Sequence, residues 1–173
     1  MPMNASVAGD IRLESAIESQ SVVENLFQYY VYEMSRFVGI SANTNGIFEF
    51  NNGDLNQYWH RDDHYPYLIR SEEELVGFVL LRKYPPNSQV YDVGQFFVLR
   101  RYSGLGFGQQ SLQQAARMHP GNWLVRVMLE NKKALGFWLA AITSLTGGCF
   151  SHTVEIDGDF PMHFIRFSCV NGI

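Results

Sequence analysis

The chain has 173 residues, of which 46% are hydrophobic and 17% charged, and its 13 Lys and Arg against 17 Asp and Glu give a formal net charge of −4. This composition predicts one globular domain, residues 1–173, because the length suffices for one core and is short for two. The acidic balance and the lack of basic runs argue against nucleic acid as a partner. No apolar run approaches the ~20 residues of a membrane span, so we expect no membrane partner and a cytoplasmic location.

The first predicted elements are a strand within residues 10–17 and an amphipathic helix that follows it. The sequence SVVE at 21–24 matches a capping box, with Ser21 as N-cap, and apolar residues then recur at helical spacing. Residues 39–64 are rich in Asn, Gly, Asp and Ser, which indicates a long irregular segment. Such segments in compact domains are often functional.

The rest of the chain alternates strands and helices. Apolar runs predict strands at 65–70, 74–83, 90–99 and 123–130, helices at about 104–118 and 131–145, and a closing pair of strands in CFSHTVEI and MHFIRFSCV. The order is therefore β α β β β α β α β β. Two crossover helices flanked by strands predict an α/β fold in which a mixed central sheet has helices on both faces.

The two cysteines and the segment WHRDDHY, residues 59–65, are the candidates for metal ligands. Cys149 and Cys169 both stand in apolar strand-like contexts, which favours small buried side chains over a disulfide or metal pair. His60 and His64 have helical spacing, but Pro66 follows closely and favours a loop. We therefore expect no metal.

The same segment has a second interpretation. Trp59, Asp62 and Asp63 combine an aromatic ring with two carboxylates, which is a suitable wall for a cationic amine. Ordinary loop residues are the alternative.

A glycine-rich stretch, LRRYSGLGFGQQ at residues 99–110, lies between an apolar strand and a helix. Glycines at alternate positions let backbone N–H groups converge on an anion at a helix N-terminus. A P-loop is excluded because Gln109 and Gln110 follow the last glycine where Lys and Ser or Thr are needed. The spacing G-x-G-x-G also differs from the dinucleotide-binding fingerprint. A tight turn with no ligand is the remaining alternative.

Residues 101–106, Arg-Tyr-Ser-Gly-Leu-Gly, match the R/Q-x-x-G-x-G/A signature of the GNAT superfamily of acyl-CoA-dependent N-acetyltransferases. The strand FFVL before the signature, the helix after it, and WLVRVMLEN with Asn131 opening the next helix are similar to that superfamily over residues 74–146. The segments YPYLIR, FFVLRR and ALGFW also resemble sequences of a bacterial group of predicted acetyltransferases. The resemblance implies the GNAT fold and transfer of an acetyl group from acetyl-CoA, as co-substrate, to a primary amine of a small molecule or peptide.

The resemblance also implies a binding site for coenzyme A. Its pyrophosphate would accept hydrogen bonds from the backbone of Arg101, Tyr102, Ser103, Gly104, Leu105 and Gly106. In the family the fourth and fifth strands separate after a bulge, for which Gly94 is the expected place here. Backbone groups of Phe97 and Val98 would then face the pantetheine and the thioester. Asn131 would bind the pantetheine, cap the helix, or do both.

The catalytic residues are less well defined by the resemblance. Many family members have a Tyr general acid seven residues after the Asn, but this chain has Trp138, which donates a hydrogen bond and cannot act as an acid near neutral pH. Water would then protonate the thiolate. Asp92 is the first candidate for the base, and its alternative role is that of a paired carboxylate in a central strand. The further candidates for the base are His152, Glu155 and His163, for which a structural role is the alternative.

Two other functions remain open at this point. Trp138 and the lack of an unambiguous base favour a non-catalytic acyl-CoA-binding module. An acetyltransferase acting on a protein N-terminus or lysine would need an open groove where residues 39–64 lie. The sequence leaves assembly as a homodimer open as well.

Overall fold

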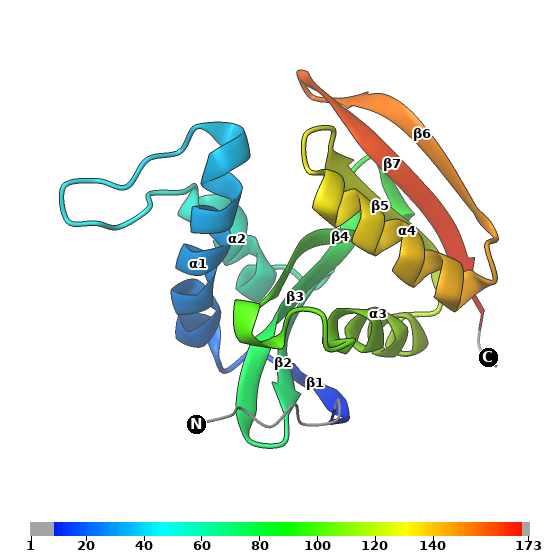
Figure 1. Cartoon of the computed structure of the whole chain (residues 1–173), viewed down its shortest axis with the longest axis horizontal. Coiled ribbons are helices and arrows are strands. Elements are labelled where there is room, and N and C mark those ends of the chain that lie inside the picture. The colour runs from blue at the N-terminus through cyan, green and yellow to red at the C-terminus, as the bar shows by residue number, and fades with distance from the viewer. Residues whose placement is uncertain (1–8, 171–173) are drawn as a thin grey trace.

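The computed structural model describes residues 9–170 and builds them around one mixed sheet of seven strands (Figure 1). The strands are β1 (Ile11–Ser15), β2 (His64–Ser71), β3 (Glu74–Tyr84), β4 (Asn87–Val98), β5 (Gly121–Met128), β6 (Phe150–Asp157) and β7 (Phe160–Cys169). The helices are α1 (Gln20–Val38), α2 (Asn52–His60), α3 (Phe107–Met118) and α4 (Lys132–Thr146), with a short 3-10 turn, η1 (Arg100–Tyr102), before α3. The predicted order is confirmed, with α2 as an addition.

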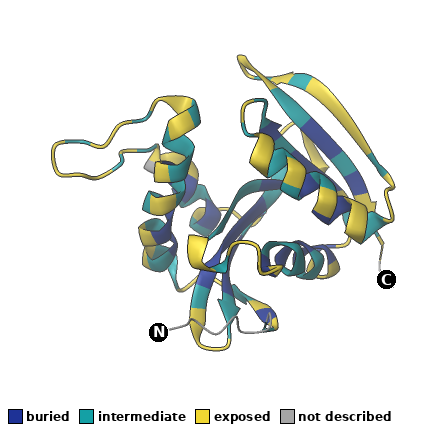
Figure 2. Cartoon of the chain, viewed as in Figure 1, coloured by how far each residue is buried: buried dark blue, intermediate teal, exposed yellow. Residues whose placement is uncertain are grey.

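The sheet has the spatial order β1-β2-β3-β4-β5-β7-β6, and helices cover both of its faces. Alternate residues of the central strands point to opposite faces, as the pleat requires. Leu68, Phe78 and Leu80 pack under α1 and α2, whereas Ile69, Val79 and Leu81 pack under α3 and α4. Burial follows this pattern, with the strands dark and the outer sides of the helices exposed (Figure 2).

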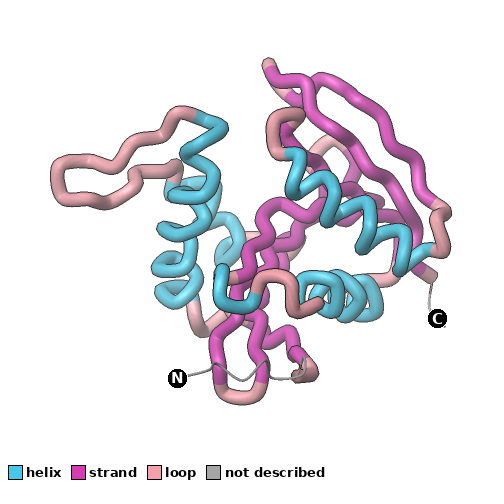
Figure 3. The backbone as a smooth tube through the Cα atoms, viewed as in Figure 1, coloured by secondary structure: helices cyan, strands magenta, loops and turns pink. Residues whose placement is uncertain are grey.

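Helix α2 corrects the prediction that residues 39–64 are irregular throughout. Asn51 caps this helix, since its side-chain oxygen accepts a hydrogen bond from the N–H of Gly53 at 3.1 Å. Leu55 and Tyr58 are three residues apart and both are buried against the sheet. The apolar stripe of α2 is too short to stand out among its polar neighbours. The stretch before the helix remains a loop that projects from the body (Figure 3).

Two local predictions were wrong. Helix α1 begins at Gln20 and Ser19 is its N-cap, without a side-chain capping bond, so the capping box at Ser21 does not form. Glu24 instead accepts a hydrogen bond from the side chain of Gln20 at 3.0 Å. Cys149 is exposed in the turn before β6, and only Cys169 is partly covered. Burial raises the pKa of the Cys169 thiol.

Strands β4 and β5 run side by side only at their start. The parallel pairs are Val90–Asn122, Tyr91–Trp123 and Asp92–Leu124, and no pair follows them within the described chain. On the other side of β4, Leu80 lies opposite Gln95 and Leu81 opposite Val93, so Gly94 has no partner. An unpaired residue of this kind is a β-bulge, which bends its strand. The bulge expected at Gly94 is therefore present, and β4 and β5 separate directly after the three pairs.

Within residues 9–170, no helix combines the length and the apolar character that crossing a membrane requires.

Candidate active site

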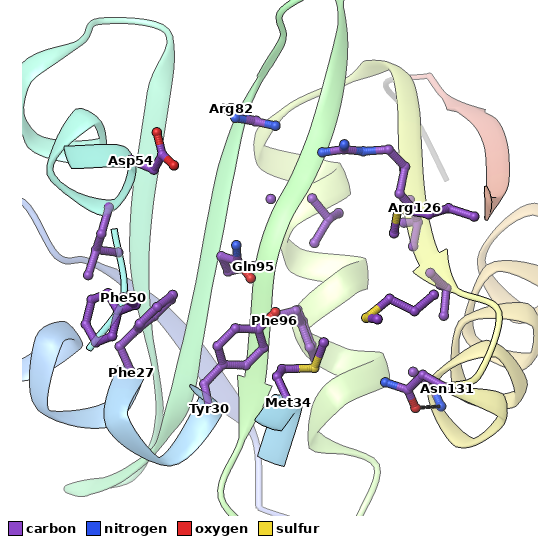
Figure 4. Close-up of a pocket in the computed structure, with 18 of the residues that line it drawn as sticks. Phe27, Tyr30, Met34, Phe50, Asp54, Arg82, Gln95, Phe96, Arg126 and Asn131 are labelled. Carbon is purple, nitrogen blue, oxygen red and sulfur yellow. Dashed lines mark hydrogen bonds between the residues drawn. The ribbon is translucent and has the colours of Figure 1, made fainter. Parts of the chain in front are cut away.

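A cleft of about 560 Å³ opens where β4 and β5 separate. One wall comes from α1, α2 and the loop before α2, and the other from β5 and α4, with β4 between them (Figure 4). On the first wall lie Phe27, Tyr30, Met34, Phe50, Asp54 and Tyr58; on the second lie Arg126, Met128, Asn131, Ala134 and Trp138. The cleft thus joins the two sides of the split sheet.

The glycine loop presents free backbone N–H groups at the start of α3, where Gly108 lies next to Phe96 of the cleft lining. The N–H groups of Gly104, Gly106 and Gly108 donate to no acceptor among residues 9–170. Gly104 and Gly106 have φ angles of +80° and +82°, and a Cβ on either would have no atom within 4 Å. Both therefore face open space in a conformation that favours glycine. Because Gly106 is the N-cap of α3, the partial positive charge of the helix dipole adds to these donors.

The free N–H groups alternate with used ones along the loop. The N–H of Tyr102 donates to Leu99 at 2.9 Å, that of Ser103 to Arg100 at 3.1 Å and that of Leu105 to Tyr102 at 3.4 Å. The Arg101 side chain is exposed and lies 3.5 Å from a Glu74 carboxylate oxygen. Of the predicted residues 101–106, Arg101, Gly104 and Gly106 therefore have a backbone N–H without an acceptor among the described residues.

Gly108 was missed as a required glycine. A Cβ there would stand 2.9 Å from ring atoms of Phe137, so the absent side chain lets α3 pack closely against α4. The alternate glycines of GLGFG were the signal in the sequence.

Backbone alternation decides which groups of β4 face the cleft. The N–H of Leu99 donates to the carbonyl of Val76 on β3 at 2.9 Å. Because backbone groups alternate along an antiparallel strand, those of Phe97 also point to β3, whereas those of Phe96 and Val98 point toward β5. Of the two predicted residues, Val98 thus points its backbone groups toward the β5 side and Phe97 does not, whereas Phe96 does.

Asn131 and Trp138 both lie on the α4 wall of the cleft. Asn131 is the N-cap of α4, and its side-chain oxygen accepts a hydrogen bond from the N–H of Ala134 at 3.1 Å. Its amide nitrogen has no acceptor in the part of the chain that the structure describes. Trp138 is buried and meets the ring of Phe96 edge to face at 5.0 Å.

Asp92 is fully buried and paired with two arginines. Its Oδ2 accepts hydrogen bonds from Arg82 Nε at 2.8 Å and from Arg126 Nη2 at 2.7 Å, and its Oδ1 accepts from Arg126 Nε at 3.2 Å. Arg126 also donates to Asp157 at 2.5 Å. Burial alone would lower the pKa of Arg126, but the two carboxylates outweigh burial and raise it. The geometry of Asp92 is that of a paired carboxylate.

The predicted contacts of the acceptor lie outside the cleft lining. Trp59 donates from its indole nitrogen to the carbonyl of Ala16 at 2.9 Å, and Asp62 is exposed in the turn before β2. Asp63 accepts two hydrogen bonds from Arg61, which hold its pKa well below the usual range. The reason is α2, whose helical turn brings Tyr58 rather than its neighbour Trp59 into the cleft.

The other candidates for the base lie on the β6–β7 hairpin and line no part of the cleft. His152 and His163 share a hydrogen bond of 2.9 Å. Glu155 accepts two hydrogen bonds from Arg166, which lower the pKa of Glu155 to about 2. All three side chains have partners within the hairpin.

Three polar residues on the strands of the cleft were missed in the sequence: Arg82, Gln95 and Arg126. Each adjoins or interrupts an apolar run, and a polar residue in such a position is a signal of function or pairing. No metal centre is evident either, since the described residues contain no group of three or more His, Cys, Asp or Glu side chains placed to hold an ion.

A sheet that splits beside a glycine-rich helix N-terminus defines a class of α/β proteins that bind an acyl carrier. The model of the acetyltransferase (GNAT) family matches residues 30–141, more than half of the chain, and the protein belongs to that family. Acetyl-CoA is the acyl donor of this family, and the free N–H groups of the glycine loop suit its pyrophosphate. None of the curated proteins compared with the sequence is a significant match.

Solved structures share the fold at low sequence identity. An acetyltransferase from Thermus thermophilus superposes with a TM-score of 0.70 at 16% identity, covering 93% of this chain and 98% of that one. A spermidine N-acetyltransferase from Vibrio cholerae gives 0.58 at 14% identity, covering 92% and 94%. A nucleotide-linked sugar GNAT protein, FdhC, gives 0.62 at 15% identity, covering 91% and 85%.

Proposed function

We propose that this protein is an N-acetyltransferase that moves the acetyl group of acetyl-CoA directly to a primary amine of a small molecule or peptide. The observation that carries the proposal is the set of free N–H groups of Gly104, Gly106 and Gly108 at the start of α3, where Gly108 lies next to Phe96, a residue of the cleft lining. A donor anchored by its phosphates at the loop would place its thioester in the split of the sheet. The α1–α2 side of the same cleft then remains for the amine.

Several residues would bind the donor. The N–H groups of Gly104, Gly106 and Gly108 would bind the pyrophosphate, and the amide nitrogen of Asn131 would bind the pantetheine. The N–H groups of Phe96 or Val98 would polarise the thioester carbonyl. Acetyl-CoA supplies an activated acyl group: the amine nitrogen forms the new C–N bond, the C–S bond breaks, and the thiolate leaves and takes a proton.

We further propose that Asp92 is a positioning residue and not the base. Both of its oxygens already accept hydrogen bonds from guanidinium groups, so it fixes Arg82 and Arg126 in place. Tyr58 would not supply the proton either, because burial raises its pKa and keeps the hydroxyl protonated. Water in the open cleft would carry the protons, and Trp138 would serve as a packing wall beside the thioester.

A small acceptor suits the cleft better than a folded protein. Helix α2 and Phe50 stand along the acceptor side, where a protein substrate would need an open groove.

A non-catalytic acyl-CoA-binding module is the alternative. The observation that favours it is Trp138, whose side chain cannot donate a proton as an acid. A cytoplasmic location and a homodimer stay predictions.

Coenzyme A release with a panel of amines, amino acids and peptides tests this function, with acetyl-CoA binding measured in parallel by calorimetry. We expect tight binding and release that depends on one class of amine. Tight binding without release from any amine would support the binding module. Absence of binding would overturn the assignment of the cofactor site.

A further inference from the structure

The side chain of Gln95 carries an unused hydrogen-bond acceptor inside the cleft. Its Oε1 is buried and accepts no hydrogen bond from any residue in the described range 9–170. Gln95 lies opposite Leu80, which packs under α1 and α2, so its side chain points to the acceptor side of the sheet. Figure 4 shows it in the middle of the cleft, between Phe27 and Arg126. A buried oxygen of this kind is satisfied when a ligand donates an N–H or O–H group.

Arg82 offers unused donors in the same cleft. Its Nε donates to Asp92 at 2.8 Å, while its two Nη groups donate to no acceptor that the structure describes. The side chain is 27% exposed and lines the cleft. Because Asp92 is fully buried and also bound by Arg126, the guanidinium of Arg82 is anchored with its outer edge free. That edge has the geometry that binds a carboxylate.

The two free groups are close enough to bind one small molecule. Gln95 faces Leu80 across the β3–β4 pair, and Arg82 stands two residues further along β3, on the same face. Diagonal neighbours of this kind have Cα atoms roughly 7 Å apart. Gly94 lies between them without a side chain, so β4 leaves this space open, and the hydroxyl of Tyr58 from α2 occupies the part next to Gly94.

The charges of the lining lie at two separate places. The guanidinium groups of Arg82 and Arg126 are both bound by Asp92, and Arg126 also by Asp157, whereas the exposed carboxylate of Asp54 stands on α2. Asp54 accepts a hydrogen bond from the Asn51 side chain at 2.8 Å and lies across from Arg82 in Figure 4. A positive and a negative pole on opposite sides of one cleft complement a zwitterion. On the α1–α2 side the lining also has an aromatic wall, formed by Phe27, Tyr30 and Phe50.

We infer that the acceptor is an α-amino acid or a close analogue with an apolar or aromatic side chain. This inference rests on the proposed acetyl transfer. Arg82 binds the carboxylate, and Gln95 Oε1 accepts a hydrogen bond from the amine. An oxygen that only accepts from the amine leaves the nitrogen lone pair free to point at the thioester. The aromatic wall of Phe27, Tyr30 and Phe50 receives the side chain.

The test compares four acceptors by coenzyme A release: L-phenylalanine, L-phenylalaninamide, 2-phenylethylamine and spermidine, each corrected for its fraction of neutral amine. We expect kcat/KM for phenylalanine to exceed that for the other three by about tenfold or more, since only phenylalanine carries the carboxylate. If an amine without a carboxylate reacts equally well, the inference is overturned while the acetyltransferase function stands. If none of these or the wider panel reacts, the proposed function itself fails.

Variants of Arg82 and Gln95 test which group of the acceptor each residue binds. Arg82→Gln should raise KM for phenylalanine about tenfold more than it raises KM for 2-phenylethylamine, because that amine has no carboxylate to lose. Gln95→Leu should lower kcat/KM for both acceptors alike. Arg12→Gln, at an exposed arginine of β1, is the control and should change neither. An equal loss for both acceptors in Arg82→Gln would overturn the carboxylate role. If Arg82→Gln does not fold, the comparison of the four acceptors with the wild-type protein still tests the inference.

Discussion

The hydroxyl of Tyr58 occupies the position that a side chain on Gly94 would need, since an ideal Cβ on Gly94 would stand 2.0 Å from the Tyr58 oxygen. Tyr58 comes from α2 and Gly94 from the bulge of β4, so the contact joins the acceptor wall to the point where the sheet splits. The glycine at the bulge is therefore required by its neighbour, not by its own backbone conformation.

Gly94→Ala should destabilise the fold by roughly 1–3 kcal/mol through this clash. In a Tyr58→Phe background the same change should cost less, because the next ring atom, Cζ, lies 3.4 Å from the added Cβ. Denaturant unfolding of the wild type, both single variants and the double variant gives the coupling energy, which we expect to be about 1 kcal/mol or more. Additive single effects would show that the contact is not the cause.

Gly104→Ala should weaken acetyl-CoA binding by at least ~2 kcal/mol, because a side chain strains the loop and displaces N–H donors from the phosphates. Gly106→Ala should behave similarly. Gly46→Ala is a matched control: Gly46 has a φ of +76°, a Cβ there would also meet nothing within 4 Å, and it lies in the loop before α2. Calorimetry measures the binding. Equal affinity in all three variants would remove the loop from the cofactor site.

Asp92→Asn should destabilise the protein by about 3 kcal/mol, since it leaves two guanidinium groups without their buried charge partner. It should raise the KM of the acceptor through loss of the fixed position of Arg82. The acidic limb of the kcat/KM pH profile should remain, because protonation of the acceptor amine itself sets it and water, not Asp92, takes the proton. Asp157→Asn, which affects only the outer bond of Arg126, is the milder control. Loss of the acidic limb in Asp92→Asn would restore Asp92 as the base.

Trp138→Phe should lower turnover by less than about tenfold, because the ring packs against Phe96 and transfers no proton. Steady-state rates at saturating acetyl-CoA measure this effect, and the melting temperature serves as the control for folding. A loss of about 10³ with an intact fold would show that the indole takes part in the chemistry.

Stability should fall as the pH drops below about 6.5, where an unfolded histidine takes up a proton. His119 is buried and its Nε2 lies 2.7 Å from the Tyr67 hydroxyl; burial and the nearby Lys83 charge lower its pKa. The unfolded chain therefore binds a proton at His119 that the folded chain does not bind. Stability is lost as the pH falls toward the pKa of His119 in the folded chain. His119→Gln should reduce the pH dependence of unfolding. An unchanged dependence would show that His119 is not its cause.

The element order and the bulge could be predicted because their signals are local. Apolar runs fix the strands, and the glycines of residues 104–108 mark the start of α3 whatever lies around them. Gly94 was predictable as the bulge because an isolated glycine in a strand often marks one.

The acceptor side of the cleft could not be predicted in the same way. The role of Arg82 depends on Asp92 and Arg126, which come from two other strands. The oxygen of Gln95 is unpaired because no hydrogen-bond donor of the described chain reaches it, and only the folded structure shows this. The wall itself depends on α2, whose apolar stripe is only two residues long. Trp59, Asp62 and Asp63 had the right chemistry, but the helical turn directs Tyr58 inward in their place.

The split between β4 and β5 also places two strand edges in the interior of a sheet. An unpaired edge is normally a liability, because any extended chain can add to it and start aggregation. Here the opening lies between α1 and α2 on one side and α4 on the other. An extended chain can reach those edges only through the cleft. A ligand that pairs with them would complete the interrupted sheet, and the helices on either side leave no room for a second sheet to add there.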